Sequence, residues 1–283
     1  KAVLEAGSEG AAEWTAAATP SPTLAVPASL QASLMARLDR LGPAREIAQI
    51  GAAIGREFSH ALLASVVHKP EAELASALDR LIAAGLLFRQ GVPPHASYLF
   101  KHALVQDAAY GTLLREPRRA LHARIAETLE GQFADMAESQ PELLARHCTE
   151  AGQIEKAAVF WSEAGQRSLA RSAFVEAAGQ LRKGLALIAN LPEGIPRVRH
   201  ELDLQIALGK AMIATKGYAA PETGDAFNRA RSLCEQLDRP PQLVTVLHGQ
   251  WAHVLLAGDL ALARSRAEEL LTLGMERNDP VWT

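Results

Sequence analysis

A short strand that continues without a loop into a helix is the feature that most constrains this chain. It spans Tyr98–Leu114, with the sequence YLFKHALVQDAAYGTLL. Just before the helix, Leu86–Arg89 and Ser97–Phe100 are two short apolar segments, and the turn that joins them contains one glycine and two prolines. This pattern predicts a β-hairpin. His102 is then expected at the junction between the second strand and the helix.

Four helices are predicted before the hairpin from the spacing of their apolar residues. They are Ala28–Leu41, a second built on Ile47, Ile50 and Ile54, a short third at Phe58–Val67, and Glu71–Ala84. Gly42 with Pro43, Gly55 and Gly85 end the first, second and fourth, and Ser59 suits a helix N-cap. Helices followed by a hairpin are the element order of a winged helix, so residues 27–135 are predicted to form a winged-helix domain.

The pattern changes from Gln140 onward. Pro141 suits a first helical position, and small and large side chains then alternate as in a tetratricopeptide-type helical hairpin. One copy contains Leu144, Ala145, Cys148, Gly152, Ala157, Trp161 and Ala164, and a second contains Gly258, Asp259, Ala263, Ala267 and Leu270, with Trp251 on the preceding helix. Between them lie the helical segments Phe174–Leu191, Pro196–Lys216 and Pro221–Leu237. The predicted fold class is therefore mainly α: a winged-helix domain with a short β-hairpin, then seven helices in residues 136–283 stacked as a TPR-like α-solenoid with a concave binding face.

Composition agrees with a helical protein of two domains. The chain has 283 residues, is rich in Ala and Leu, and has only 5% aromatic residues. Cys148 and Cys234 both lie in helical patterns and form no CxxC pair, which indicates reduced thiols and a cytoplasmic location. There is no apolar run of membrane-spanning length and no signal-peptide pattern at the N-terminus, so no membrane partner is expected.

Both ends of the chain are expected to be cut from a longer protein. The first residue is Lys, and KAVLEAG has the pattern of the last turns of a helix that ends at Gly7. Residues 8–22 are rich in Ala, Ser, Thr, Gly and Pro, which predicts an irregular linker, although Trp14 could instead anchor a short strand. The chain ends with Trp282 and Thr283, directly after an amphipathic helix.

The sequence carries no recognisable catalytic or metal-binding set. It has no GxxxxGKS or GxxxxGKT phosphate-binding loop, no HExxH and no GxSxG motif. Its nine histidines are scattered, and His122 and His147 have no histidine at helical spacing. We therefore expect no enzyme activity and no metal or cofactor in this part of the protein.

Nucleic-acid binding is a second possible function for a winged helix, but the charges argue against it. The helix that would enter a major groove carries Glu71, Glu73 and Asp79 against the single cation Arg80, whereas groove readers need cations. A basic cluster follows at Arg115, Arg118, Arg119 and Arg124, opposite the apolar stripe of Leu121, Ile125 and Leu129. We interpret it as a solvated helix face. A DNA-binding transcriptional regulator, with repeats that bind an effector, stays the alternative function.

His102 is the candidate binding residue. At a helix N-terminus the free N–H groups and the positive end of the helix dipole favour an anion, and an imidazole there could donate one hydrogen bond to it. The alternative interpretation is a capping or core-edge histidine whose ring is satisfied by the backbone.

Several segments resemble a known family. These are the stretch VPASLQASLMARLDRLGPAREIAQIGAAIGREFSHALLASV, then LDRLIAAGLLFRQ, YLFKHALVQDAAYGTLL, LLARHCTEAG and WSEAGQRSLARSA. Together they are similar to the region that follows the ATPase module in bacterial STAND-type signalling ATPases, especially those that join a class III nucleotide cyclase to an AAA-type ATPase module and tetratricopeptide repeats. The resemblance covers Val26 to about Trp282, and FKHALVQDAAY is its most specific part. It implies that residues 1–26 contain the end of the ATPase module's lid helix and a linker.

The resemblance also implies a role for Lys101 and His102. In STAND relatives of the NB-ARC type, a Met-His-Asp triplet at this point places its histidine on the phosphate of bound ADP. Phe100-Lys101-His102-Ala103 resembles that triplet with the histidine kept, but Ala103 stands where the acid would be. Asp107, one turn later, could compensate only with a different geometry. Lys101 and His102 are therefore the expected nucleotide-sensing residues.

The family resemblance predicts a regulatory and protein-interaction region. Its partners would be the ATPase module of the same chain, which would bind ATP or ADP with Mg²⁺, and a protein or small-molecule inducer on the repeats. Exchange of the nucleotide would shift the contact at His102, move the winged helix, and expose or hide the repeats.

Overall fold

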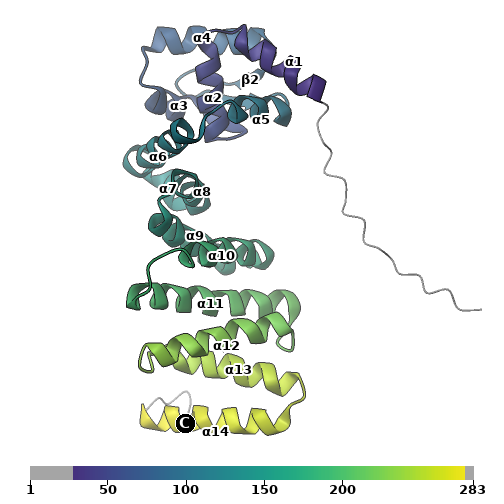
Figure 1. The fold of residues 1–283 in the computed structure, drawn as a ribbon, viewed down its shortest axis with the longest axis vertical. Helices are drawn as coiled ribbons and strands as arrows, with labels where there is room; N and C mark the ends of the chain where they lie inside the picture. Colours follow the sequence, from purple (N-terminus) through teal and green to yellow (C-terminus); the bar gives the residue numbers. More distant parts are fainter. Residues whose placement is uncertain (1–27, 278–283) are drawn as a thin grey trace, which may run out of the picture.

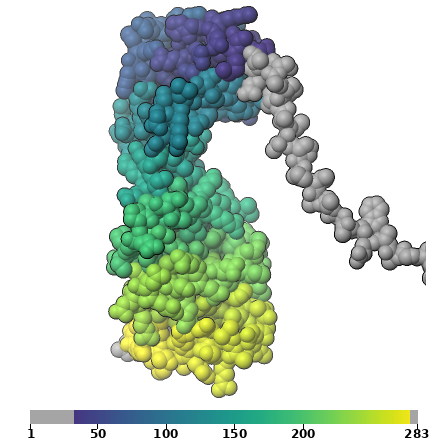
Figure 2. Space-filling view, viewed as in Figure 1, coloured from purple at the N-terminus to yellow at the C-terminus, as the bar shows by residue number. Residues whose placement is uncertain are grey.

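A computed structural model describes residues 28–277 of the chain, and the predictions made for residues 1–27 and 278–283 lie outside them. The described part is mainly helical and elongated, and the chain runs from one end to the other in sequence order (Figures 1 and 2). No helix between residues 28 and 277 combines the length and the apolar character that a membrane span requires.

The N-terminal half contains eight helices and three strands up to Ala151 within the described residues. They are α1 (Ala28–Asp39), α2 (Ala44–Ile54), β1 (Glu57–Ser59), α3 (His60–Val67), α4 (Glu71–Ala83), β2 (Leu87–Gln90), β3 (Ser97–Phe100), α5 (Ala103–Gly111), α6 (Arg115–Gln132), α7 (Ala134–Ser139) and α8 (Pro141–Ala151). The predicted helix boundaries at Gly55 and Gly85 are confirmed, and Gly85 has a φ of +67° that favours glycine.

The strands form one antiparallel sheet in the order β1-β3-β2. β2 and β3 form the predicted hairpin, with Phe88 opposite Leu99. The prediction that Phe58–Val67 is entirely helical is wrong at its start, because Phe58 lies in β1 and pairs with Tyr98 of β3. Ser59 ends the strand and caps α3 as predicted: the backbone N–H of Leu62 donates to Ser59 Oγ over 3.2 Å.

The second half continues as an array of helices. These are α9 (Ile154–Ala170), α10 (Phe174–Ile188), α11 (Ile195–Lys216), α12 (Pro221–Gln236), α13 (Leu243–Leu256) and α14 (Leu260–Glu276). With α8 they make seven helices between residues 141 and 277, the number predicted (Figure 1). Each of α9 to α14 packs mainly against its neighbours in sequence, and α8 packs against α6 and α9. The apolar core of the first half includes Leu144, Cys148 and Ala157, so it extends across the predicted domain boundary after residue 135.

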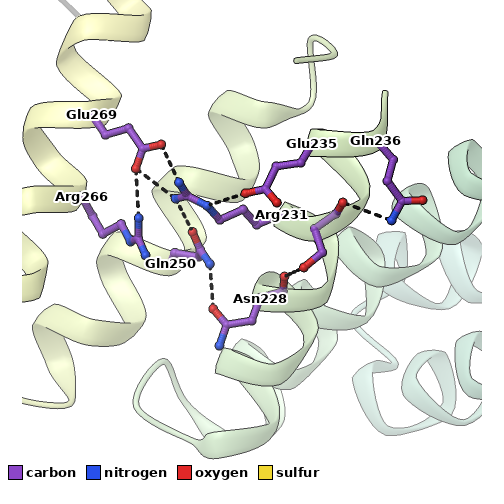
Figure 3. Close-up of polar contacts among 8 residues, drawn as sticks. Asn228, Arg231, Glu235, Gln236, Gln250, Arg266 and Glu269 are labelled. Atoms are coloured by element: carbon purple, nitrogen blue, oxygen red, sulfur yellow. Dashed lines mark hydrogen bonds and ion pairs between the residues drawn. The ribbon is translucent and has the colours of Figure 1, made fainter. Parts of the chain in front are cut away.

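A polar network joins the last three helices. Arg231 of α12 makes a two-pronged ion pair with Glu269 of α14, with N–O distances of 2.8 and 2.9 Å (Figure 3). Gln250 of α13 accepts from the same guanidinium and donates to Asn228 Oδ1 over 2.7 Å. Arg266 of α14 also donates to Glu269, at the Oε2 atom that Arg231 Nη1 contacts. Because Gln250 is buried, its two hydrogen bonds satisfy a side chain that would otherwise oppose the packing of α13.

Glycines inside helices allow close packing around Phe227 of α12. A Cβ atom added at Gly209 of α11 would lie 2.8 Å from the Phe227 ring, and one added at Gly249 of α13 would also collide with it. The ring therefore fits between two neighbouring helices only because both lack a side chain at the contact.

We expect Gly209→Ala to destabilise the protein by about 1–3 kcal/mol, because the added methyl group overpacks the Phe227 contact. The matched control is Gly179→Ala on α10, where a Cβ atom would meet no heavy atom within 4 Å. That change should stabilise the protein by about 0.5–1 kcal/mol through helix propensity. Urea unfolding of both variants measures the difference, and equal effects would contradict this account of the packing.

Candidate functional site

His102 lies between the last residue of β3 and the first residue of α5. Its backbone is extended, with φ −135° and ψ 139°, and its carbonyl oxygen accepts from the backbone N–H of Val105 over 3.0 Å. Its side chain caps none of the helix N–H groups and is exposed. The structure therefore does not support the alternative of a capping or core-edge histidine, and the ring can face a partner.

The neighbouring Lys101 lies on the outer face of the sheet. Its backbone N–H donates to the carbonyl of Leu86 over 3.0 Å, which fixes the end of β3 beside the start of β2. Its ammonium nitrogen lies 4.4 Å from the centre of the Phe88 ring, a cation–π contact. No described contact joins this ammonium group to His102, so the structure places the two predicted residues side by side in sequence without making them one cluster.

Arg37 is a second cation beside this junction, and no pattern in the sequence predicts its position there. Its guanidinium donates to the carbonyl of Ala84, at the C-terminus of α4. A Cβ atom at Gly85 would lie 3.6 Å from Arg37 Nη2 and 3.7 Å from Lys101 Nζ, so both cations lie against the same glycine. Neither forms an ion pair with a carboxylate between residues 28 and 277. The end of β3 is therefore positively charged without an internal counter-ion in that range.

Two acidic side chains of α4 form ion pairs within the first half of the chain. Glu71 Oε1 lies 2.9 Å from Nε2 of the buried His60, and Asp79 pairs with Arg89 of β2 at 3.4 Å. In the predicted basic cluster on α6, Arg118 lies over the Tyr110 ring and Arg119 pairs with Glu116 at 3.7 Å. The stripe of Leu121, Ile125 and Leu129 on the opposite face is buried, as predicted.

A buried histidine pair is the polar feature that the sequence did not predict. His122 of α6 and His147 of α8 are 2% and 0% exposed, and their Nδ1 atoms lie 2.8 Å apart. They are 25 residues apart on different helices, so a search for histidines at helical spacing cannot find them. No group of three or more His, Cys, Asp or Glu side chains suited to a metal ion occurs between residues 28 and 277.

The groups around this pair determine which nitrogen of each ring carries the hydrogen atom. Arg146 Nη2 lies 3.3 Å from His147 Nε2, and a guanidinium can only donate, so that nitrogen accepts. A neutral ring carries one N–H, so His147 Nδ1 donates to His122 Nδ1. His122 Nε2 must then donate to the Tyr110 hydroxyl over 2.9 Å, and this hydroxyl donates to Glu150 over 3.3 Å. One consistent chain of donors runs from Arg146 to Glu150.

Burial keeps both rings neutral. Burial lowers the pKa of His122 to about 4, with Arg146 and Arg118 acting in the same direction and Glu150 opposing them. Burial, Arg146 and His122 lower the pKa of His147 to about 2. Desolvation of the guanidinium lowers the pKa of Arg146, although the residue as a whole is exposed, and this group also donates to the carbonyl of Ile54 at the C-terminus of α2.

The histidine pair should make stability depend on pH. Both pKa values lie below the value near 6.5 expected in the unfolded chain, so the unfolded state binds more protons, and stability is fully present above pH 6.5 and falls with pH below it. We expect His147→Asn to reduce the slope between pH 6.5 and 5 by about 1 kcal/mol per pH unit. Urea unfolding at several pH values measures the slope. His95→Gln, at an exposed histidine, is the control, and an unchanged slope in His147→Asn would refute the assignment.

Comparisons with known proteins identify no family. No protein-family model matches the chain. An uncharacterized protein of Rhizobium meliloti (strain 1021) is similar to it, with 29% identity over 255 residues, which is 89% of this chain. The chain spans about a quarter of the length of that relative.

Proposed function

We propose that this chain is the regulatory and partner-binding region of a nucleotide-switched signalling ATPase. In this proposal, the first half is a winged helix that docks on a nucleotide-binding module of the same chain. The helices from α8 onward are tetratricopeptide-like repeats that bind a protein or a small-molecule inducer. The region itself has no catalytic role, and the parent protein works in the bacterial cytoplasm with ATP or ADP and Mg²⁺.

The observation that carries the proposal is the exposed side chain of His102 at the N-terminus of α5, which caps none of the helix N–H groups. The first N–H groups of a helix favour an anion, and Lys101 and Arg37 add uncompensated positive charge nearby. A phosphate supplied by a neighbouring module would complete this arrangement. Ala103 provides no carboxylate to compete for the ring, and no described contact joins the Asp107 carboxylate to His102.

The outer face of the sheet supports docking at the same end. Phe88 and Leu99 pair across β2 and β3 and are 54% and 36% exposed. Lys101 covers part of the Phe88 ring, so the apolar face continues directly into the cationic end of β3. Exposed apolar side chains that adjoin a charged site are typical of a surface that another domain covers.

Nucleotide retention tests this proposal. In the full-length protein, His102→Ala should weaken ADP binding about 10-fold or more, because a hydrogen bond to a charged group contributes about 1.5–3 kcal/mol. Displacement of a fluorescent ADP analogue measures the dissociation constant. His95→Ala, at an exposed histidine in the β2–β3 turn, is the control. Equal ADP affinity in the parent and in His102→Ala would remove the sensor role.

The alternative function, a DNA-binding regulator, has a separate test. The pairs that Glu71 and Asp79 form with His60 and Arg89 keep acidic groups fixed on α4, where a groove-reading helix would need cations. We expect no saturable binding of the full-length protein to duplex DNA at physiological salt. A gel-shift or anisotropy titration at several salt concentrations measures this. Tight binding with a steep salt dependence would favour the regulator instead.

A further inference from the structure

The start of α11 follows a connector that contains no helix or strand. Residues 189–194 connect α10 to α11, and in Figure 1 this connector bows out at the edge of the molecule beside α9. The first residues of α11 are exposed, and Ile195 keeps 51% of its surface in contact with solvent. The connector and the first turn of α11 thus form one side of a space next to α9, and we call this side the wall.

A cavity of about 630 Å³ lies behind this wall. Its lining comes from the first turns of α9, the connector, the start of α11 and Glu130 near the end of α6. The surface that it presents is mostly apolar and includes Val159, Phe160, Leu191, Pro192 and Pro196. This volume and this lining are those of a site for a small organic molecule, in which a few polar groups set the orientation of the ligand.

Some of the charged side chains at the cavity are paired within the protein and others are not. Lys156 is held by Glu130, with Nζ 2.9 Å from one carboxylate oxygen and 3.2 Å from the other. Arg197 donates to the carbonyl of Leu191 over 2.9 Å but forms no ion pair with a carboxylate between residues 28 and 277, and His200 also lines the cavity. Glu155 and Glu193 are exposed at the cavity and form no ion pair with any residue between 28 and 277. Two unpaired carboxylates are therefore available to a ligand, against the one unpaired guanidinium of Arg197.

We propose that this cavity binds a small amphiphilic cation: an apolar body against Phe160, Leu191 and Pro196, with an amine near Glu155 and Glu193. An anionic ligand would meet two unpaired carboxylates against the single unpaired cation Arg197, so repulsion would outweigh attraction and oppose its binding. The inference goes beyond the proposed function, because the cavity binds this class of molecule whether or not the first half docks on a nucleotide-binding module.

Three probes with one apolar body and different charges test the class of ligand. They are 4-phenylbutylamine, 4-phenylbutan-1-ol and 4-phenylbutyrate, titrated against the full-length protein by saturation-transfer NMR. We expect the amine to bind tightest and the carboxylate weakest, with steps of roughly threefold or more, the size of exposed charge interactions. Equal affinities for amine and carboxylate, or no saturable binding of the amine, would overturn the proposal.

Two variants locate the probe. Gly194 lines the cavity, its φ of 161° is extended backbone that any residue adopts, and an added Cβ atom would meet only Pro196 Cδ at 3.7 Å. Gly194→Phe should therefore fill the cavity and weaken the amine about 10-fold or more, with folding checked by its melting temperature. Undiminished amine binding in a folded Gly194→Phe protein would place the probe elsewhere and overturn the proposal.

The charge variant is Glu155→Gln combined with Glu193→Gln, two surface changes that should leave folding intact. It should weaken the amine roughly three- to tenfold and leave the alcohol unchanged. Glu163→Gln is the matched control, because Glu163 is an exposed carboxylate on the same helix α9 but outside the cavity. Equal effects of the double variant and of Glu163→Gln on the amine would contradict the assigned carboxylates.

Discussion

The guanidinium of Arg146, hydrogen-bonded to groups of α2 and α8, is the constraint on which the joint between α8 and the preceding helices depends. A guanidinium can only donate, so its bonds to the Ile54 carbonyl and to His147 set the direction of every hydrogen bond that follows, through His122 and Tyr110 to Glu150. These groups come from α2, α5, α6 and α8. His122 and His147 are buried, and a buried polar group that loses its partner costs about 1–3 kcal/mol, so the network favours one register of α8 against α2, α5 and α6.

Local signals in the sequence were sufficient for most of the fold. Proline, glycine and serine act within one turn of their own position, so Pro141, Gly85 and Ser59 mark helix ends that the structure contains. The hairpin and the number of helices in the array follow from the same kind of signal. β1 was missed because three residues carry no period, and it exists only through its pairing with β3, which lies about 40 residues later.

The candidate sites also divide into features that local sequence signals predict and features that depend on contacts between distant segments. The position of His102 between a strand and a helix followed from the sequence, and the side chain is exposed there. Arg37 and the pair of His122 with His147 could not be predicted, because each depends on which helices meet across the core. The cavity beside α11 depends on how far a connector stands away from α9. Such features arise from tertiary packing, for which one sequence gives no pattern.

The distribution of charge explains why the two proposed binding regions differ in sign. At the end of β3, Arg37 and Lys101 are satisfied by a carbonyl and an aromatic ring rather than by carboxylates, so their charge attracts an anion from outside. Beside α11, Lys156 is paired with Glu130, and the two unpaired carboxylates of Glu155 and Glu193 outnumber the one unpaired cation, Arg197. Exposed charges act over about 8–10 Å at physiological salt, and the two sites lie on helices that are far apart along an elongated molecule (Figure 1). Each site can therefore select its own ligand. Communication between the two sites has to pass through the packing of α6 and α8 rather than through electrostatic interaction.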